Sequence, residues 1–228
     1  LGIYSIGAKF AIFITLAVET FRKAWAPIAM DSMHSGDGVE TFRMIARLYV
    51  GICCSGVVVL TIISPWLVQT FTTRVEYHVG WPLVGVLAWQ PICYGFYLIA
   101  AGGIWKSEKT HLGTIPMIGA GILNIILNYL LVPQWGGMGA AISTVISYFA
   151  WIMVTIAISE RLWKVGFPLK SLIVLSTLSL SFVIWVTNFD GHTSFWRMFL
   201  MGCAVIVVLT VLTIDSQTRA LIRSRISI

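Results

Sequence analysis

Charged side chains are scarce in this sequence, and their scarcity excludes a soluble globular domain. Asp, Glu, Lys and Arg make up 11% of the 228 residues, hydrophobic residues make up 58%, and the mean hydropathy is +0.90. Soluble domains carry about 25% charged residues. Apolar runs of about 20 residues, the length of a membrane-spanning helix, recur along the whole chain. The composition therefore predicts a polytopic membrane protein.

The sequence also lacks the residue clusters that hold metals or carry redox chemistry. Its four cysteines lie in apolar runs, with no C-x2-C spacing and no nearby pair of histidines: Cys53, Cys54, Cys93 and Cys203. Such a pattern is typical of small packing residues. The four histidines stand singly at the ends of apolar runs. We therefore expect no metal, no cofactor and no enzymatic chemistry.

What the sequence does contain is a series of apolar spans joined by short connections. Each is long enough to cross roughly 30 Å of hydrocarbon. We place seven of them at 3–29, 43–64, 81–103, 112–132, 137–158, 170–188 and 195–214. No connection can house a soluble domain, so residues 1–228 are expected to form a single, all-α transmembrane domain. Because the chain starts at Leu1 with an apolar run and no signal-peptide features, we expect the C-terminal part of a longer protein.

Lys and Arg are distributed unevenly between the two sides of these spans. Twelve fall on the side that holds the C-terminus, and three fall on the other: Lys9, Arg74 and Arg197. Cytoplasmic loops carry the excess of Lys and Arg. We therefore expect a protein of the inner (plasma) membrane, with the N-terminus of this segment outside and the C-terminus in the cytoplasm. Topology explains the net charge of +6, so nucleic acid is not an expected partner.

The first span carries the most unusual polar residues. Glu19 is followed by Arg22 and Lys23 at the third and fourth positions, so a local ion pair on one helix face would lower its cost in the membrane. Alternatively, Thr15, Glu19 and Arg22 share a face that lines a water-filled cavity. Lys9 has no acidic residue at helical spacing, so its charge must reach the headgroups or meet an anion.

The third span holds Gln90-Pro91 near its middle. Proline there removes a backbone hydrogen bond and predicts a kink. Gln90, Tyr94 and Tyr97 share one helix face, which is either a polar, aromatic wall for a sugar or part of a kinked packing helix.

Residues 124–148 predict a hairpin of two apolar helices. Asn124 and Asn128 lie on one face of the first helix. Because unpaired amides are costly in hydrocarbon, this face is expected to meet a protein interior or a wet cavity. The turn and the start of the second helix are built from small or turn-forming residues: Pro133, Gly136, Gly139, Ala140 and Thr144. Gly136, Ala140 and Thr144 recur every four residues, a stripe that lets membrane helices pack closely.

The pattern N-x3-N-x4-P-x2-G-x2-GAA-x2-T-x3-Y of this hairpin resembles the late helices of Wzx-like polysaccharide flippases. These belong to the multidrug/oligosaccharidyl-lipid/polysaccharide exporter superfamily. Residues 2–9 are similar to the opening of a central flippase helix, and Ala24-Trp25-Ala26-Pro27 to the motif that closes it before a cytoplasmic loop. The resemblance implies the C-terminal lobe of a MATE-like fold, with the N-terminal half of the transporter as its missing partner.

The resemblance further implies the substrate. Such proteins export undecaprenyl-pyrophosphate-linked oligosaccharides for O-antigen, lipopolysaccharide and other surface polysaccharides, by alternating access among membrane lipids. A pyrophosphate calls for cations and a sugar calls for amides and hydroxyls. Lys9 matches a lysine position of the family and is the first candidate. The other candidates for the cavity are Glu19, Arg22, Lys23, Arg43, Arg47, Gln90, Tyr94, Asn124 and Asn128.

Three other functions remain to be weighed. A multidrug or cation antiporter of the same superfamily needs a buried carboxylate, and Glu19, the deep acidic residue here, has basic neighbours. A membrane glycan polymerase or glycosyltransferase would need a large outer loop or a catalytic cluster, and Arg74-Val-Glu76-Tyr-His78 is the one polar cluster among the outer connections. A retinal protein would need a lysine within 195–214, where there is none.

Overall fold

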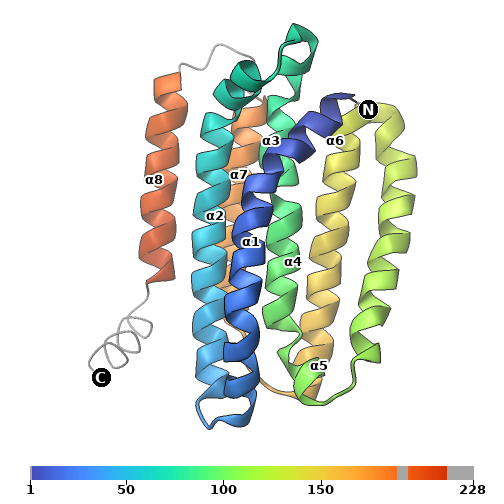
Figure 1. Cartoon of the computed structure of the whole chain (residues 1–228), viewed down its shortest axis with the longest axis vertical. Helices are drawn as coiled ribbons and strands as arrows, with labels where there is room; N and C mark the ends of the chain where they lie inside the picture. The colour runs from blue at the N-terminus through green and yellow to red at the C-terminus, as the bar shows by residue number, and fades with distance from the viewer. Residues whose placement is uncertain (1, 189–194, 215–228) are drawn as a thin grey trace.

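A bundle of long, apolar helices makes up the computed structural model, which describes residues 2–188 and 195–214 (Figure 1). In chain order its elements are α1 (Gly2–His34), α2 (Gly38–Phe71), the 3-10 helix η1 (Val75–Gly80), α3 (Trp81–Leu87), α4 (Trp89–Ala100), α5 (Gly102–Lys106), α6 (His111–Leu162), α7 (Leu169–Asn188) and α8 (Phe195–Thr213). The prediction of an all-α, polytopic membrane helix bundle is confirmed.

Six helical stretches within the described residues are long and apolar enough to cross a membrane. The longest, α6, contains two of the predicted spans, because its backbone reverses at Gly136 (φ 53°, ψ −128°). The positive φ favours glycine, which has no Cβ to clash there. The two limbs of α6 lie side by side in Figure 1. The hairpin predicted over residues 124–148 is thus present.

The third span is broken where its proline requires it. Pro91 has no N–H to donate to Leu87, and its ring would crowd that carbonyl. The helix accordingly breaks at Ala88, between α3 and α4, and again at Ala101, between α4 and α5. The predicted kink is confirmed.

The first helix ends later than predicted. The motif that closes at Pro27 suggested a loop directly afterwards, yet α1 continues through Pro27 for two more turns to His34. Ala29, Ser32 and Met33 are buried in this extension. Their packing holds the helix together despite the hydrogen bond that Pro27 cannot make.

α2 is the packing centre of the bundle and contacts α1, α3, α4, α7 and α8. Buried polar side chains find partners on neighbouring backbones: the indole of Trp25 donates to the carbonyl of Leu98 (3.3 Å), and the Tyr49 hydroxyl donates to the carbonyl of Ile92 (3.0 Å). These bonds satisfy polar groups that would be costly to leave unpaired in an apolar interior. They also fix α1 and α2 against α4.

The charge bias can be tested on two exposed threonines at opposite ends of the bundle. Thr73 lies between α2 and η1, and Thr110 lies between α5 and α6. A membrane-impermeant thiol reagent is expected to label Thr73→Cys only from outside the cell and Thr110→Cys only from the cytoplasm. The unsubstituted protein is the control, since its own cysteines lie within the spans. Labelling of Thr110→Cys from outside would reverse the orientation.

Candidate functional site

A small polar pocket lies between α1, the α3–α4 break and the second limb of α6. Its volume is about 200 Å³. Thr15, Gln90, Tyr94 and Tyr148 provide its polar wall, and the Gln90 side-chain amide donates to the Tyr148 hydroxyl (3.3 Å). We call this site the polar pocket. Two of the predicted cavity residues, Gln90 and Tyr94, therefore meet in one place.

Local structure explains why space is left there. The small side chains of Ala8 and Ala11 face the pocket from α1, and the helix break at Ala88 lies at its edge. Trp151 of α6 supports the aromatic wall, with ring centroids 6.5 Å from Tyr94 and 5.7 Å from Tyr148.

The third member of the predicted face lies elsewhere. Tyr97 stacks on Trp151, with ring centroids 4.3 Å apart, and does not line the pocket. For this residue the packing interpretation holds.

The chemistry of the polar pocket is that of neutral hydrogen bonding. None of its described lining residues is charged. Amide and hydroxyl groups both donate and accept hydrogen bonds, and the tyrosine rings add flat apolar surfaces. This combination suits a sugar better than a cation.

Further along α1, on the face that carries Thr15, two charged side chains form an ion pair. Arg22 Nη2 lies 2.7 Å from Glu19 Oε2, one to two turns beyond Thr15. The sequence-based expectation of a local ion pair is confirmed. Lys23, the alternative partner of Glu19, is exposed.

Lys9 lies away from the polar pocket. Together with Arg74 it lines a different cavity, of about 350 Å³, to which α1 contributes Ser5, Ile6, Lys9 and Phe10. The polar pocket takes Ala8, Ala11 and Thr15 from the same helix. Side chains at these positions point to different faces, because successive residues turn by about 100° around a helix axis. The structure therefore places Lys9 in a different site from Gln90 and Tyr94.

The two asparagines join the limbs of the α6 hairpin. Asn128 donates to Asn124 (Nδ2 to Oδ1, 2.9 Å), and the Ser143 hydroxyl donates to Asn128 Oδ1 (2.7 Å). Their polar groups thus have partners inside the protein, which removes much of their cost in the membrane. A clasp between helices accounts for these residues without a substrate.

The small-residue stripe of the hairpin differs from the predicted one. On the second limb the small residues Gly139, Ser143 and Ser147 are buried, whereas Gly136 is exposed and Ala140 and Thr144 are half-buried. A Cβ added at Gly139 would overlap the backbone carbonyl of Leu131. These buried small residues are offset by three positions from the predicted stripe, because Gly136 forms the turn itself and the close approach begins after it.

The predicted cytoplasmic cations have structural contacts. Arg43 donates through Nε to the carbonyl of Val165, in the connection between α6 and α7. Glu160 caps the same connection by accepting from the backbone N–H groups of Gly166 (2.7 Å) and Phe167 (3.1 Å). Arg47 lies one turn further along α2 and is half-buried. These contacts hold together the end of the bundle that the charge bias predicts to be cytoplasmic.

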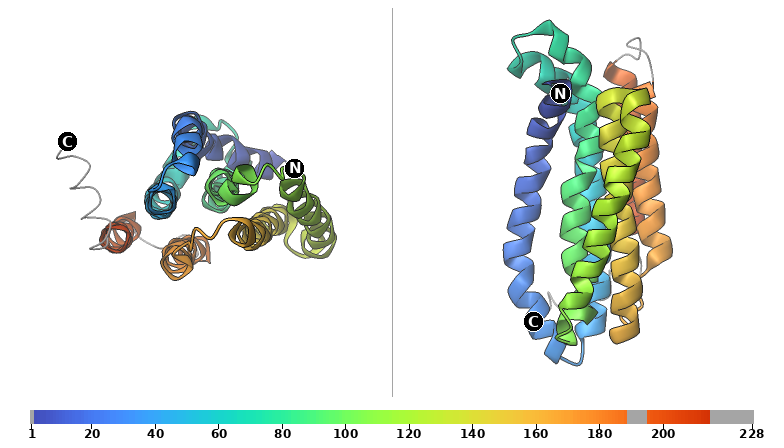
Figure 2. Two further views of the ribbon diagram at one scale, coloured as in Figure 1. Left: turned by 90° about the horizontal axis from the view of Figure 1, so that it is seen from below. Right: turned by 90° about the vertical axis from the view of Figure 1, so that its right-hand side faces the viewer.

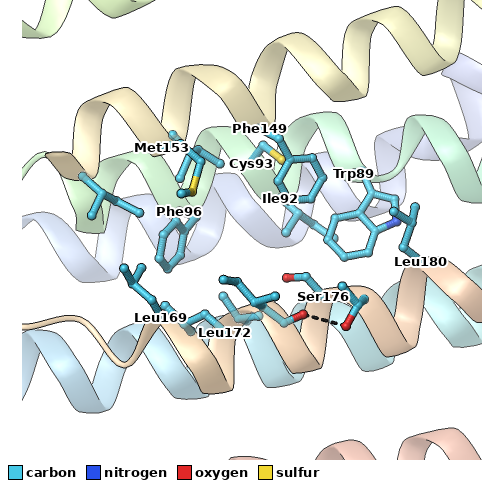
Figure 3. Close-up of a pocket in the computed structure, with 15 residues that line it drawn as sticks. Trp89, Ile92, Cys93, Phe96, Phe149, Met153, Leu169, Leu172, Ser176 and Leu180 are labelled. Carbon is cyan, nitrogen blue, oxygen red and sulfur yellow. Dashed lines mark hydrogen bonds between the residues drawn. The ribbon is translucent and has the colours of Figure 1, made fainter.

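An apolar groove, unforeseen from the sequence, lies between α4, the second limb of α6 and α7 (Figure 3). Its volume is about 300 Å³. Trp89, Phe96, Phe149, Met153, Leu172 and Leu180 are among the side chains that line it. The Thr177 hydroxyl in its wall already donates to Ile173 (2.8 Å). Polar substrates gain little in such a site.

The sequence analysis did not identify the hydrogen-bond partners of two predicted residues: Tyr148, which bonds Gln90, and Ser143, which bonds Asn128. Tyr148 belongs to the hairpin motif, but its meeting with Gln90 depends on how two distant spans pack. Ser143 was recognisable in principle: Asn128 and Ser143 stand eight residues before and seven after Gly136. Because the chain reverses at Gly136, residues at similar distances before and after it lie side by side on the two limbs.

The sequence has a weak similarity to a bacterial multidrug resistance protein. The sequence is 29% identical over 166 residues to the probable multidrug resistance protein NorM of Bacillus cereus. The match covers 68% of this chain but only 37% of that protein. No family model and no solved structure matches. The chain thus spans little more than a third of the relative's length, and its six apolar helices are those of a multi-pass membrane protein.

Proposed function

We propose that this chain is one lobe of a transporter that exports a lipid-linked oligosaccharide, with undecaprenyl pyrophosphate as the lipid carrier. The observation that carries the proposal is the polar pocket: it offers an amide and three hydroxyl groups, and no charge, between α1, α4 and α6. Sugars bind through hydrogen bonds to such groups and through stacking on aromatic rings.

The ion pair of Glu19 supports the same proposal. A cation or proton antiporter uses an intramembrane carboxylate that can bind and release its ion. Glu19 instead lies 2.7 Å from the guanidinium of Arg22. An incoming cation would have to compete with a permanent positive charge for that carboxylate.

The proposed transporter is longer than this chain. The match to NorM covers 37% of the relative's length, as expected for one lobe of a two-lobed protein. A second lobe would complete the transport cavity, and alternating access would then follow from rocking of the two lobes around it. The first half predicted from the sequence therefore stays part of the proposal.

A multidrug exporter is the second candidate, and the printed name of NorM favours it. Drug-binding cavities are mainly apolar and aromatic, and the ring-rich wall around Trp151 fits that description as well. The two candidates differ in substrate and share the fold.

Transport by the full-length protein separates the two. Spheroplasts that express it are expected to present the lipid-linked oligosaccharide at the outer leaflet, where an added lectin or glycosidase reaches it, and to show unchanged tolerance of cationic drugs. Cells without the protein are the control. Drug tolerance that rises while the oligosaccharide stays inside would refute the proposal and establish the multidrug alternative.

A further inference from the structure

The start of α1 and the end of α2 lie at the same end of the bundle (Figures 1 and 2), where both contact η1. A second cavity, the outer cavity, is lined by residues of these three elements and of the connection between α2 and η1. Its volume is about 350 Å³. This is the end that the Lys/Arg bias places outside the cell. Its lining brings together two residues far apart in sequence, Lys9 of α1 and Arg74 just before η1.

The outer cavity concentrates positive charge without a counterion. Lys9 and Arg74 are its charged lining residues, and within residues 2–188 and 195–214 neither forms an ion pair. Like charges brought to one site repel each other, and an anion between them relieves that repulsion. Thr73 and Tyr77 add two hydroxyl groups that have no hydrogen-bond partner in the described part of the chain.

Several of the side chains that line the outer cavity are apolar. Phe10 and Phe71 pack at its edge with ring centroids 6.3 Å apart, and Ile6 is buried beside them. Phe71 is 68% exposed, at the last residue of α2. A free inorganic anion makes no use of these rings. An amphiphile does, because its charged group and its hydrocarbon meet in one molecule.

We propose that the outer cavity binds the phosphate groups of a lipid headgroup in the outer leaflet, with Lys9 and Arg74 as the anion ligands. Arg74 contributes the planar fork that pairs with phosphate oxygens, and Lys9 contributes a mobile point charge. Two lipids carry this chemistry: the pyrophosphate-linked carrier after it has crossed, and a resident anionic phospholipid. For the first lipid the assignment rests on the function proposed above; for the second it does not.

Because different faces of α1 line the two cavities, the outer cavity and the polar pocket act at different steps of transport. Lys9 and Thr15 point to different faces of the helix, so a headgroup at Lys9 is outside the polar pocket. The outer cavity is thus an exit site, where a pyrophosphate is held after its sugar has left the polar pocket.

Native mass spectrometry of the full-length protein tests the site directly. The protein is released from phosphatidylcholine nanodiscs that also contain either phosphatidylglycerol or undecaprenyl pyrophosphate. Lys9→Gln and Arg74→Gln are each expected to weaken retention of the phosphate-bearing lipid about tenfold, the worth of one charge-assisted hydrogen bond. Arg197→Gln removes an equally exposed cation near the start of α8, outside the cavity, and is expected to change nothing.

Comparing the two lipids shows whether the site binds the transported carrier or a resident phospholipid. Loss of undecaprenyl pyrophosphate alone identifies the transported carrier as the ligand, and loss of phosphatidylglycerol alone identifies a resident lipid; either supports the site. Undiminished retention of both lipids by the double variant would overturn it. Because both side chains are exposed and unpaired in the described structure, the variants should keep the unfolding temperature of the unsubstituted protein. A protein that retains phosphatidylglycerol through Lys9 and Arg74 yet exports no oligosaccharide would refute the proposed function and leave this site standing.

Discussion

Leucine in place of Gly139 is expected to open the α6 hairpin and to destabilise the protein by about 3 kcal/mol or more, the upper range for overpacking. A Cβ at this position overlaps the carbonyl of Leu131 on the opposite limb, so one limb must move as a whole. The clasp would be lost with it, because Ser143 sits one turn further on the same face and donates to Asn128.

Purified full-length protein provides the measurement, by thermal or denaturant unfolding in detergent. Gly121→Leu is the matched control: Gly121 lies on the first limb of the same helix with no atom within 4 Å of an added Cβ, so its stability should stay within about 0.5 kcal/mol of the original.

Two smaller changes calibrate this effect. Ser143→Ala removes only a hydrogen bond between membrane helices, which is worth about 0.6 kcal/mol on average. Ala140→Leu, the change that the predicted stripe marks as severe, should also be milder than Gly139→Leu. Equal stability of the Gly139 and Gly121 variants would show that the limbs are not in backbone contact.

Filling the polar pocket is expected to abolish most transport without unfolding the protein. Thr15→Leu removes a hydroxyl from a pocket of about 200 Å³ and adds apolar volume in its place. A sugar hydroxyl left without a partner costs roughly 1–3 kcal/mol, so export should fall about tenfold or more. The readout is the amount of oligosaccharide at the outer leaflet per amount of protein.

Thr20→Leu is the control for this change. Thr20 is exposed on α1, and its hydroxyl bonds the backbone four residues earlier (2.9 Å), as that of Thr15 does (3.4 Å). It lies outside the pocket, so export should be normal. Full export by Thr15→Leu at normal protein level would remove the pocket from the transport path.

The spans and the hairpin were predictable because they depend on local properties. Apolar length decides which segments cross the membrane, Pro91 breaks its own helix, and Gly136 permits a turn that other residues resist. The pairing of Glu19 with Arg22 was predictable for the same reason, since both partners stand on one helix.

What the sequence could not supply was tertiary packing. Pro27 looked like a helix end, and only the buried residues beyond it keep α1 intact. Lys9 was predicted to share a cavity with Gln90 and Tyr94 because its charge has no partner on its own helix and its position matches the resembled family, yet the packing of α1 turns Lys9 toward η1. Arg43 was predicted as a residue of the cavity, and its bond to Val165 depends on a connection more than a hundred residues away. The outer cavity likewise needs Arg74, whose approach to Lys9 no spacing reveals.

The breaks at Ala88 and Ala101 give the bundle an uneven stiffness. α2 runs as one helix of 34 residues with Pro65 near its outer end, whereas α3, α4 and α5 form a column with two joints. A helix resists bending through its ladder of backbone hydrogen bonds, and bending concentrates where that ladder is interrupted. The upper joint lies beside Gln90, in the wall of the polar pocket, and the lower joint lies near the crossing where the Gly103 N–H bonds the Ser159 hydroxyl (2.9 Å). The segment between these joints is bonded to α2 through the Tyr49 hydroxyl, so bending of this column falls at its two ends, the upper of which borders the polar pocket.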